Sequence, residues 1–314
     1  MQPESELRPV FRNSSKSISF IIANSSNKLI NEFFRSVKML RRRIMSIAAA
    51  TNGMTGGGKT LSMRKSLTKR DTALIEHSAT IATNQPNSED MAFSHAVLCQ
   101  VGLPRAKVEA REFMRQSGAA WVNVQAGYLD EGNGPVLQPI PYGVMPRLGL
   151  AWVSTFAVRN KEREIRIGDS AAEFLRLMGM DSDGRRYATL RKQMHALAAC
   201  RLQLGFKGRT YNGQPVQQFD AWISDRAANQ RALWPGVMVL SEDYYRSLIE
   251  SAVPLDNRAL MALKGSALAL DVYAWLAHRL HRIEGRGVVL HWKSLREQFA
   301  QEYAGKDPDK NFKK

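Results

Sequence analysis

The sequence predicts an α+β protein in which two related helix-and-strand units follow a long basic N-terminal arm. Amphipathic helices alternate with short strands from about residue 91 onward, and part of that succession recurs further along the chain. Residues 1–90 differ in composition, because Ser, Asn, Thr and basic residues dominate there. The predicted boundaries are 1–90 for the arm, 91–235 for the first unit and 236–314 for the second.

The arm is expected to be largely disordered. Between Phe33 and Arg70 there are ten basic residues and no acidic one. A segment of this charge and polarity buries too little apolar surface to offset the entropy lost on folding.

A glycine string within the arm, GMTGGGKT at 53–60, satisfies the phosphate-loop pattern G-x-x-x-x-G-K-[ST]. A working loop needs an apolar strand before the glycines, a helix after them, and an acid ending another strand to hold magnesium. The flanking segments are weakly apolar, and the one loose candidate acid, Asp271, lies within a helical pattern. We therefore favour a flexible arm over a nucleotide site, which would consist of Gly53, Gly58, Lys59 and Thr60.

The first unit is expected to open with two strands and then to alternate helices and strands. Apolar residues recur every three or four positions in the helices and alternate in the strands. Asp169 or Ser170 is a suitable N-cap for one helix, and Gly179 a suitable end. The predicted elements are strands at 121–125 and 136–140, a helix at 145–158, a strand at 164–167, and helices at 171–178 and 184–200.

A hairpin is predicted after the last of these helices, with strands at 201–207 and 219–224 around the turn GRTYNGQ. The order helix, strand, helix, helix, hairpin is typical of a winged helix, a DNA-binding arrangement. The sequence thus predicts a winged-helix-like first unit.

The second unit repeats part of this order, with a helix at 266–280, a strand at 287–290 and a helix at 294–303. Fifteen positions separate Trp152 from Ile167, and fifteen also separate Trp275 from Leu290. This spacing suggests a tandem winged-helix-like unit. Its copy would be incomplete at the C-terminal end, because a recognition helix and wing should follow residue 303.

The net charge of +16 predicts an anionic partner. A membrane is the weaker candidate, since no apolar run approaches the roughly 20 residues needed to span a bilayer. Cys99 and Cys200 are too few for a disulfide framework, so a reducing cytoplasm is expected.

Duplex DNA is the favoured partner because the 36 positions between Asp183 and Asp220 contain no acid and seven basic residues. On the 184–200 helix we expect Arg185, Thr189, Lys192 and Gln193 to face outward, where they could contact base edges. The predicted DNA-binding residues are Arg185, Arg186, Thr189, Arg191, Lys192, Gln193, Arg201, Lys207 and Arg209.

Catalytic patterns are scarce. The sequence has no H-E-x-x-H and no G-x-S-x-G, and the six histidines are scattered. His195 is expected to be a packing residue or a phosphate contact. We expect a protein that is not an enzyme and that uses no metal or cofactor.

Long stretches of the chain resemble the family of plasmid-encoded RepA replication initiators, over roughly residues 91–312. Neither residues 1–90 nor the phosphate-loop string belongs to that resemblance. The matching stretches are GLPRAKV (102–108), PYGVMPRLGLAWVSTFAV (141–158), IGDSAAEFLRLMGM (167–180), VMVLSEDYYRSLI (237–249), VPLDNRALMALKGSALALDVYAWLAHRL (253–280) and HWKSLREQF (291–299).

The resemblance implies an initiator that binds repeated sites at a plasmid origin and recruits host replication proteins, with a homodimer as a possible state. The family is expected to continue after Phe312 into a basic helix, where this chain departs from it. Two alternatives stay open from the sequence. One is a DNA-binding transcriptional repressor, and the other, less favoured, is a P-loop ATPase of the partition type.

Overall fold

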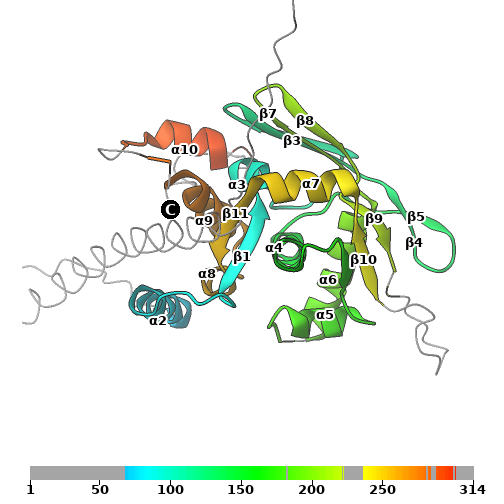
Figure 1. The fold of residues 1–314 in the computed structure, drawn as a ribbon, viewed down its shortest axis with the longest axis horizontal. Coiled ribbons are helices and arrows are strands. Elements are labelled where there is room, and N and C mark those ends of the chain that lie inside the picture. The colour runs from blue at the N-terminus through cyan, green and yellow to red at the C-terminus, as the bar shows by residue number, and fades with distance from the viewer. Residues whose placement is uncertain are drawn as a thin grey trace, which may run out of the picture.

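Helices and strands alternate through most of the chain in the computed structural model, as Figure 1 shows. The structure describes residues 68–181, 183–220, 222, 236–280, 282–283, 288–299 and 301. The glycine string at 53–60 and most of the predicted arm lie outside these residues. Within the described ranges, no helix combines the length and the apolar character needed to cross a bilayer.

The last part of the predicted arm is a helix, α2 (Lys69–Thr83). Thr68 Oγ1 accepts a hydrogen bond from the Asp71 backbone N–H, and the Asp71 carboxylate accepts one from the Thr68 N–H. This capping box satisfies groups that a helix start leaves unpaired. Ile81 is buried, and α2 packs against α8 (Asn257–Ala262). The prediction of disorder was wrong for this segment. It relied on the polar composition, which does not reveal the N-terminal cap or the one face of the helix that packs against the protein.

Three helices form near the bounds that the apolar spacing predicts. Ser170 and Asp183 cap two of them, each accepting a hydrogen bond from a backbone N–H of the first turn. Gly179, with a φ of 69°, adopts the left-handed conformation that commonly follows a helix end. The helices are α4 (Val144–Asn160), α5 (Ala171–Leu177) and α6 (Gly184–Ala199), and α6 packs against the other two.

A three-stranded antiparallel sheet lies next to these helices. It consists of β6 (Glu164–Arg166), β9 (Val216–Phe219) and β10 (Val237–Leu240), in the order β6-β10-β9. β6, which lies between α4 and α5 in the chain, therefore pairs with β10, which begins more than thirty residues after the end of α6.

The predicted hairpin has a different second strand. The turn is Lys207-Gly208, whose φ values of 47° and 84° are both positive, as a two-residue type I′ turn requires. Residues 209–213, predicted to be turn, form strand β8, and β9 pairs with β10 instead. The prediction was wrong because Asn212-Gly213 resembles a turn. The resulting sheet has the order β2 (Glu112–Ser117), β3 (Ala120–Gln125), β7 (Arg201–Phe206), β8 (Arg209–Gly213).

The remaining elements join distant parts of the chain. The predicted helices at 266–280 and 294–303 correspond to α9 (Ala267–Leu280) and α10 (Trp292–Phe299). Of the strand predicted at 287–290, the described residues 288–290 do not form a strand. A small hairpin, β4 (Tyr128–Asp130) with β5 (Pro135–Leu137), stands apart from the larger sheets. The others are β1 (Met91–His95), paired with β11 (Ala252–Asp256), and helices α3 (Ala96–Val101), α7 (Glu242–Ser251), α9 (Ala267–Leu280) and α10 (Trp292–Phe299).

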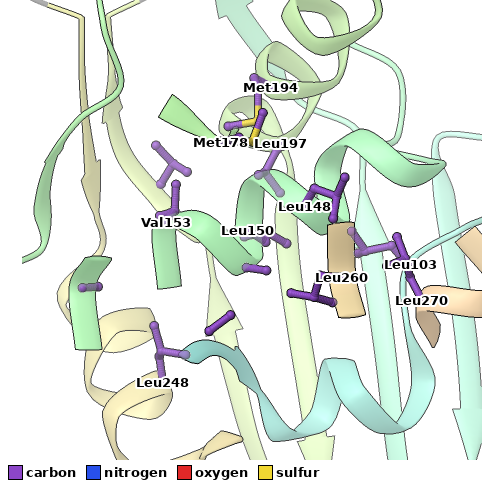
Figure 2. Packing of buried hydrophobic residues seen from close by; sticks show 14 of the residues in the cluster. Leu103, Leu148, Leu150, Val153, Met178, Met194, Leu197, Leu248, Leu260 and Leu270 are labelled. Atoms are coloured by element: carbon purple, nitrogen blue, oxygen red, sulfur yellow. The ribbon is translucent and has the colours of Figure 1, made fainter. Parts of the chain in front are cut away.

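One cluster of buried apolar side chains runs through the described structure, and α4 contributes five residues to it, Leu148, Leu150, Ala151, Val153 and Ala157. Figure 2 shows Leu150 and Val153 of α4 within this cluster, together with Met194 of α6, Leu248 of α7 and Leu270 of α9. Because the buried face of α6 is part of this cluster, the opposite face of α6 is held in a fixed position.

The predicted boundary between 235 and 236 stays a prediction, but three strand pairings cross it. β1 pairs with β11, and β10 pairs with both β6 and β9. Contacts of α4 with α7 and α9 also join the two predicted units.

Candidate nucleic-acid interface

The N-terminal half of α6 presents an exposed polar face. Arg185, Thr189 and Lys192 are exposed and follow one another at intervals of four and three, so they share one side of the helix. Leu190 and Met194, on the other side, are fully buried. A rigid helix with this division can place its polar side chains against a ligand without disturbing its core.

Gln193 is not part of this face, and its prediction as an outward reader of bases was wrong. Its side chain is 1% exposed, and its Oε1 accepts a hydrogen bond of 2.7 Å from the Tyr142 backbone N–H. The segment before α4 packs over this part of α6. This hydrogen bond is part-buried, and Gln193 supplies the partner that the Tyr142 N–H needs there.

Two of the predicted arginines are engaged within the protein. Arg186 lies 3.3 Å from the Asp183 carboxylate and 3.6 Å from that of Asp181. Arg191 is mostly buried, with its Nη2 3.9 Å from Oε2 of Glu131. Arg186 remains partly accessible beside the helix start, whereas Arg191 points into a cleft.

This cleft, of about 590 Å³, lies along one side of α6. Its other walls are the β4–β5 hairpin and the segment of residues 107–111, called here the wall segment. Basic residues outnumber acidic ones in its lining, with Lys107, Arg111, Arg191 and Lys192 against Glu109 and Glu131. Lys107 and Arg111 were not predicted from the sequence, because they carry no periodic signal and are separated from α6 by more than seventy residues.

The β4–β5 hairpin is fixed to α6 at two places. Gly127 approaches the end of α6 so closely that a Cβ there would lie 1.9 Å from the Ala199 carbonyl oxygen. Oε1 of Glu131 accepts a hydrogen bond of 2.6 Å from Gln138 and lies 3.3 Å from Nδ1 of His195. The cleft is therefore a preformed feature of the fold.

His195 is a buried packing residue, 2% exposed, whose ring lies against those of Phe219 and Trp222. Burial lowers its pKa, while the neighbouring Glu131 acts in the opposite direction. The pKa of Glu131 is also lowered: its partial burial opposes the change, but Gln138, His195 and Arg191 outweigh it. In this part of the cleft the Glu131 carboxylate thus faces the neutral imidazole of His195.

The predicted hairpin residues lie elsewhere. Arg201 donates to Asn212 Oδ1 at 2.9 Å, and Arg209 forms an ion pair of 2.6 Å with Glu250 of α7. Lys207 occupies the β7–β8 turn. Arg209 lines a second cleft, between β8, α7 and β11, which shares no lining residue with the cleft beside α6. The structure does not bring these three residues to the exposed face of α6.

The second cleft contains a histidine near two serine hydroxyls, but this arrangement is not that of a nucleophilic serine with a histidine as its base. His95 Nδ1 accepts a hydrogen bond from the Val97 backbone N–H, so the ring proton is on Nε2. That nitrogen lies 3.0 Å from Ser247 Oγ and 3.3 Å from Ser251 Oγ, and it can only donate to them. It therefore cannot accept a serine proton as a base must.

Thiol and metal chemistry likewise find no support among the described residues. Burial raises the pKa of both the Cys99 and the Cys200 thiols to about 12. No group of three or more His, Cys, Asp or Glu side chains in the described part of the chain could hold a metal ion.

Two solved structures are similar to the chain over about two thirds of its length. The crystal structure of selenomethionine derivatives of domains 2 and 3 of RctB has a TM-score of 0.45 and 13% identity, covering 69% of this chain and 83% of that one. A crystal structure of RctB domains 2–3 has a TM-score of 0.43 and 12% identity, covering 67% and 77%. No curated protein matches the sequence.

A family model matches the chain from just before α4 into α10, a range that contains α6 and all three strands of the β6-β10-β9 sheet. The family is described as "Plasmid encoded RepA protein". The resemblance in the sequence is thereby confirmed over residues 140–294, which match the family of plasmid-encoded RepA proteins.

Proposed function

We propose that the protein is a plasmid replication initiator that binds repeated duplex sites at its origin and recruits host replication proteins there. The match of residues 140–294 to the family of plasmid-encoded RepA proteins supports the initiator role. The observation that carries the DNA-binding part is the exposed face of α6, with Arg185, Thr189 and Lys192 opposite a fully buried core face. In this proposal the protein acts by binding, without catalysis, metal or cofactor.

The arrangement around α6 supports a winged-helix docking mode. In such modules the recognition helix enters the major groove and a β-hairpin contacts the DNA beside it. Here α4, β6, α5 and α6 follow in order, and β6 pairs with β10 of the β9–β10 pair. The wing in this proposal is therefore the β9–β10 strand pair, in place of the hairpin of strands 201–207 and 219–224 predicted from the sequence.

The side chains on α6 have the chemistry that the major groove requires. Arg185 can donate two hydrogen bonds to a guanine edge, and Thr189 can pair with either base type. Thr189 Oγ1 donates to the Arg185 carbonyl at 2.8 Å, so its oxygen is free to accept a further hydrogen bond. Lys192 is suited to a phosphate or a guanine.

The proposal is tested first by selection of duplexes from a random library with the full chain. Enrichment of one sequence, bound with a log-affinity against log-salt slope of roughly −4.5 to −6, fits contacts with about five to seven phosphates. A plasmid that carries this gene and the selected repeats should then replicate. Failure to bind any duplex would refute the proposal. Binding without replication would favour a transcriptional repressor instead.

A further inference from the structure

The cleft beside α6 has a second basic wall that the proposed recognition helix does not explain. Lys107 and Arg111 are exposed on the wall segment, and Ala188 and Lys192 of α6 line the same cleft. The exposed face of α6 thus continues into this cleft. The wall segment therefore borders the same cleft as the exposed face of α6.

The wall segment is anchored although it is irregular. Its last residue, Arg111, accepts a hydrogen bond of 2.8 Å from the Ala126 backbone N–H through its carbonyl oxygen. Just before it, Leu103 and Pro104 are buried, and the Pro104 carbonyl accepts from the Gly143 N–H. These backbone hydrogen bonds on both sides hold the backbone of the wall segment in place beside the cleft.

The acids of the cleft are placed so that they leave Arg111 and Lys192 available. Glu131 is satisfied by Gln138 and lies beside His195 and Arg191, at the inner end of the cleft. Glu109 pairs with Lys107 at 2.8 Å, but both side chains are at least half exposed. An exposed pair of this kind is weak, and a phosphate can displace the carboxylate.

We propose that the wall segment contacts the phosphates of the DNA strand that runs beside α6, through Lys107 and Arg111. This inference rests on the proposed function and extends it. A helix in the major groove is flanked by two phosphate backbones, and one of them would lie between α6 and the wall segment. The wall segment therefore adds affinity without adding sequence information.

The test uses the full chain and a 30-base-pair duplex that the wild-type protein selects from a random library. In the double variant Lys107→Gln/Arg111→Gln, the slope of log affinity against log salt should become shallower by about 1.8, since each phosphate contact contributes about 0.9. Affinity at 0.1 M salt should fall by about tenfold or more, equally for selected and scrambled duplexes. An unchanged slope would overturn the inference.

A matched control is Arg246→Gln, because Arg246 is an exposed arginine on α7 that pairs with Glu242 at 3.4 Å, away from the cleft. Its slope should equal that of the wild type. A loss of slope in this variant as large as in the double variant would show a diffuse charge effect, and the inference would fail.

A third variant should raise the affinity for DNA. Glu109→Gln removes the carboxylate that competes for Lys107, so affinity should rise by up to about fivefold, the range of an exposed ion pair. Misfolding cannot produce tighter binding. Unchanged or weaker binding by this variant would contradict the role of Lys107.

Duplexes with single methylphosphonate linkages locate the contact. The wild type should lose affinity when phosphates beside the base pairs read by α6 are neutralised, and the double variant should not respond at those positions. If both proteins respond identically, the wall segment does not touch DNA. Failure of this inference can be distinguished from failure of the proposed function. The proposed function stands if Arg185→Ala still weakens binding to the selected duplex, and it falls if no variant changes DNA binding.

Discussion

Arg147 of α4 and Asp271 of α9 form a buried, two-bonded ion pair, with Nε to Oδ1 at 2.7 Å and Nη2 to Oδ2 at 2.9 Å. Each side chain is only 9% exposed. The same guanidinium also donates to the carbonyls of Leu103, Pro104 and Gly143. One side chain thus joins α4, α9 and the chain that leads to the wall segment.

Asp271→Asn should therefore destabilise the fold by about 3–5 kcal/mol, because it leaves the Arg147 charge buried without its counter-ion. Urea denaturation measures this change. Glu242→Gln, which removes a partly exposed carboxylate that pairs with Arg163 and Arg246, is the control and should cost less than about 1 kcal/mol. Equal effects of the two substitutions would mean that the buried pair contributes no more than a surface pair.

Gln193→Ala should lower stability and leave base discrimination alone. The substitution removes the acceptor of the Tyr142 N–H, and loss of this part-buried hydrogen bond should cost about 1 kcal/mol. Thr189→Ala, at an exposed position of the same helix, is the control for stability. Comparison of melting curves with binding to selected and scrambled duplexes separates the effects. A Gln193→Ala variant of normal stability that has lost discrimination would restore Gln193 as a reader.

Arg185→Ala should weaken binding to the selected duplex by about one to two orders of magnitude, since one paired base edge is worth about 1–3 kcal/mol. Binding to scrambled duplex should change little, because base contacts contribute only to the cognate complex. Competition binding with both duplexes gives the ratio directly. An equal loss of affinity for both duplexes would show that Arg185 contacts a phosphate and not a base.

Acid should destabilise the protein through His95. Burial lowers the pKa of His95 to about 4, whereas the unfolded side chain titrates near 6.5. The unfolded state therefore binds the proton first, and stability is lost as the pH falls from about 6.5 toward 4, by about 3 kcal/mol in total. The groups that face the ring are Ser247, Ser251 and the stacked Tyr244, and none of them offers a negative charge.

Urea denaturation between pH 7 and pH 4.5 tests this effect. In His95→Asn, which keeps an acceptor for the N-cap of α3, the pH dependence should become flatter. The exposed His77 provides the control substitution His77→Asn, whose profile should match the wild type. Burial also lowers the pKa of His195, so part of the dependence of stability on pH should remain in His95→Asn. A His95→Asn profile identical to that of the wild type would exclude His95 as the cause.

Lys59→Ala should leave plasmid replication nearly intact, and neither protein should bind ATP detectably. Asp271, the one acid that could have ended a magnesium-binding strand, lies in α9 and is held by Arg147. Equilibrium binding of labelled ATP with magnesium measures the effect. Saturable binding that the substitution abolishes would support the ATPase alternative.

The sequence by itself determined the helices around the candidate site. Repeats of apolar residues every three or four positions, with Ser170 and Asp183 as caps, predicted α4, α5 and α6 close to their observed bounds. These signals are local, because each depends on residues within a turn or two of one another. The absence of acids from 184–219 is also a property of the sequence alone.

Only the tertiary structure decided which strands pair, which side chains are buried and which distant segments meet. β9 pairs with β10 instead of β7, and Gln193 is covered by the chain before α4. The wall segment reaches α6 from more than seventy residues away. Strand partners and burial depend on contacts between segments far apart in sequence, which no local periodicity encodes.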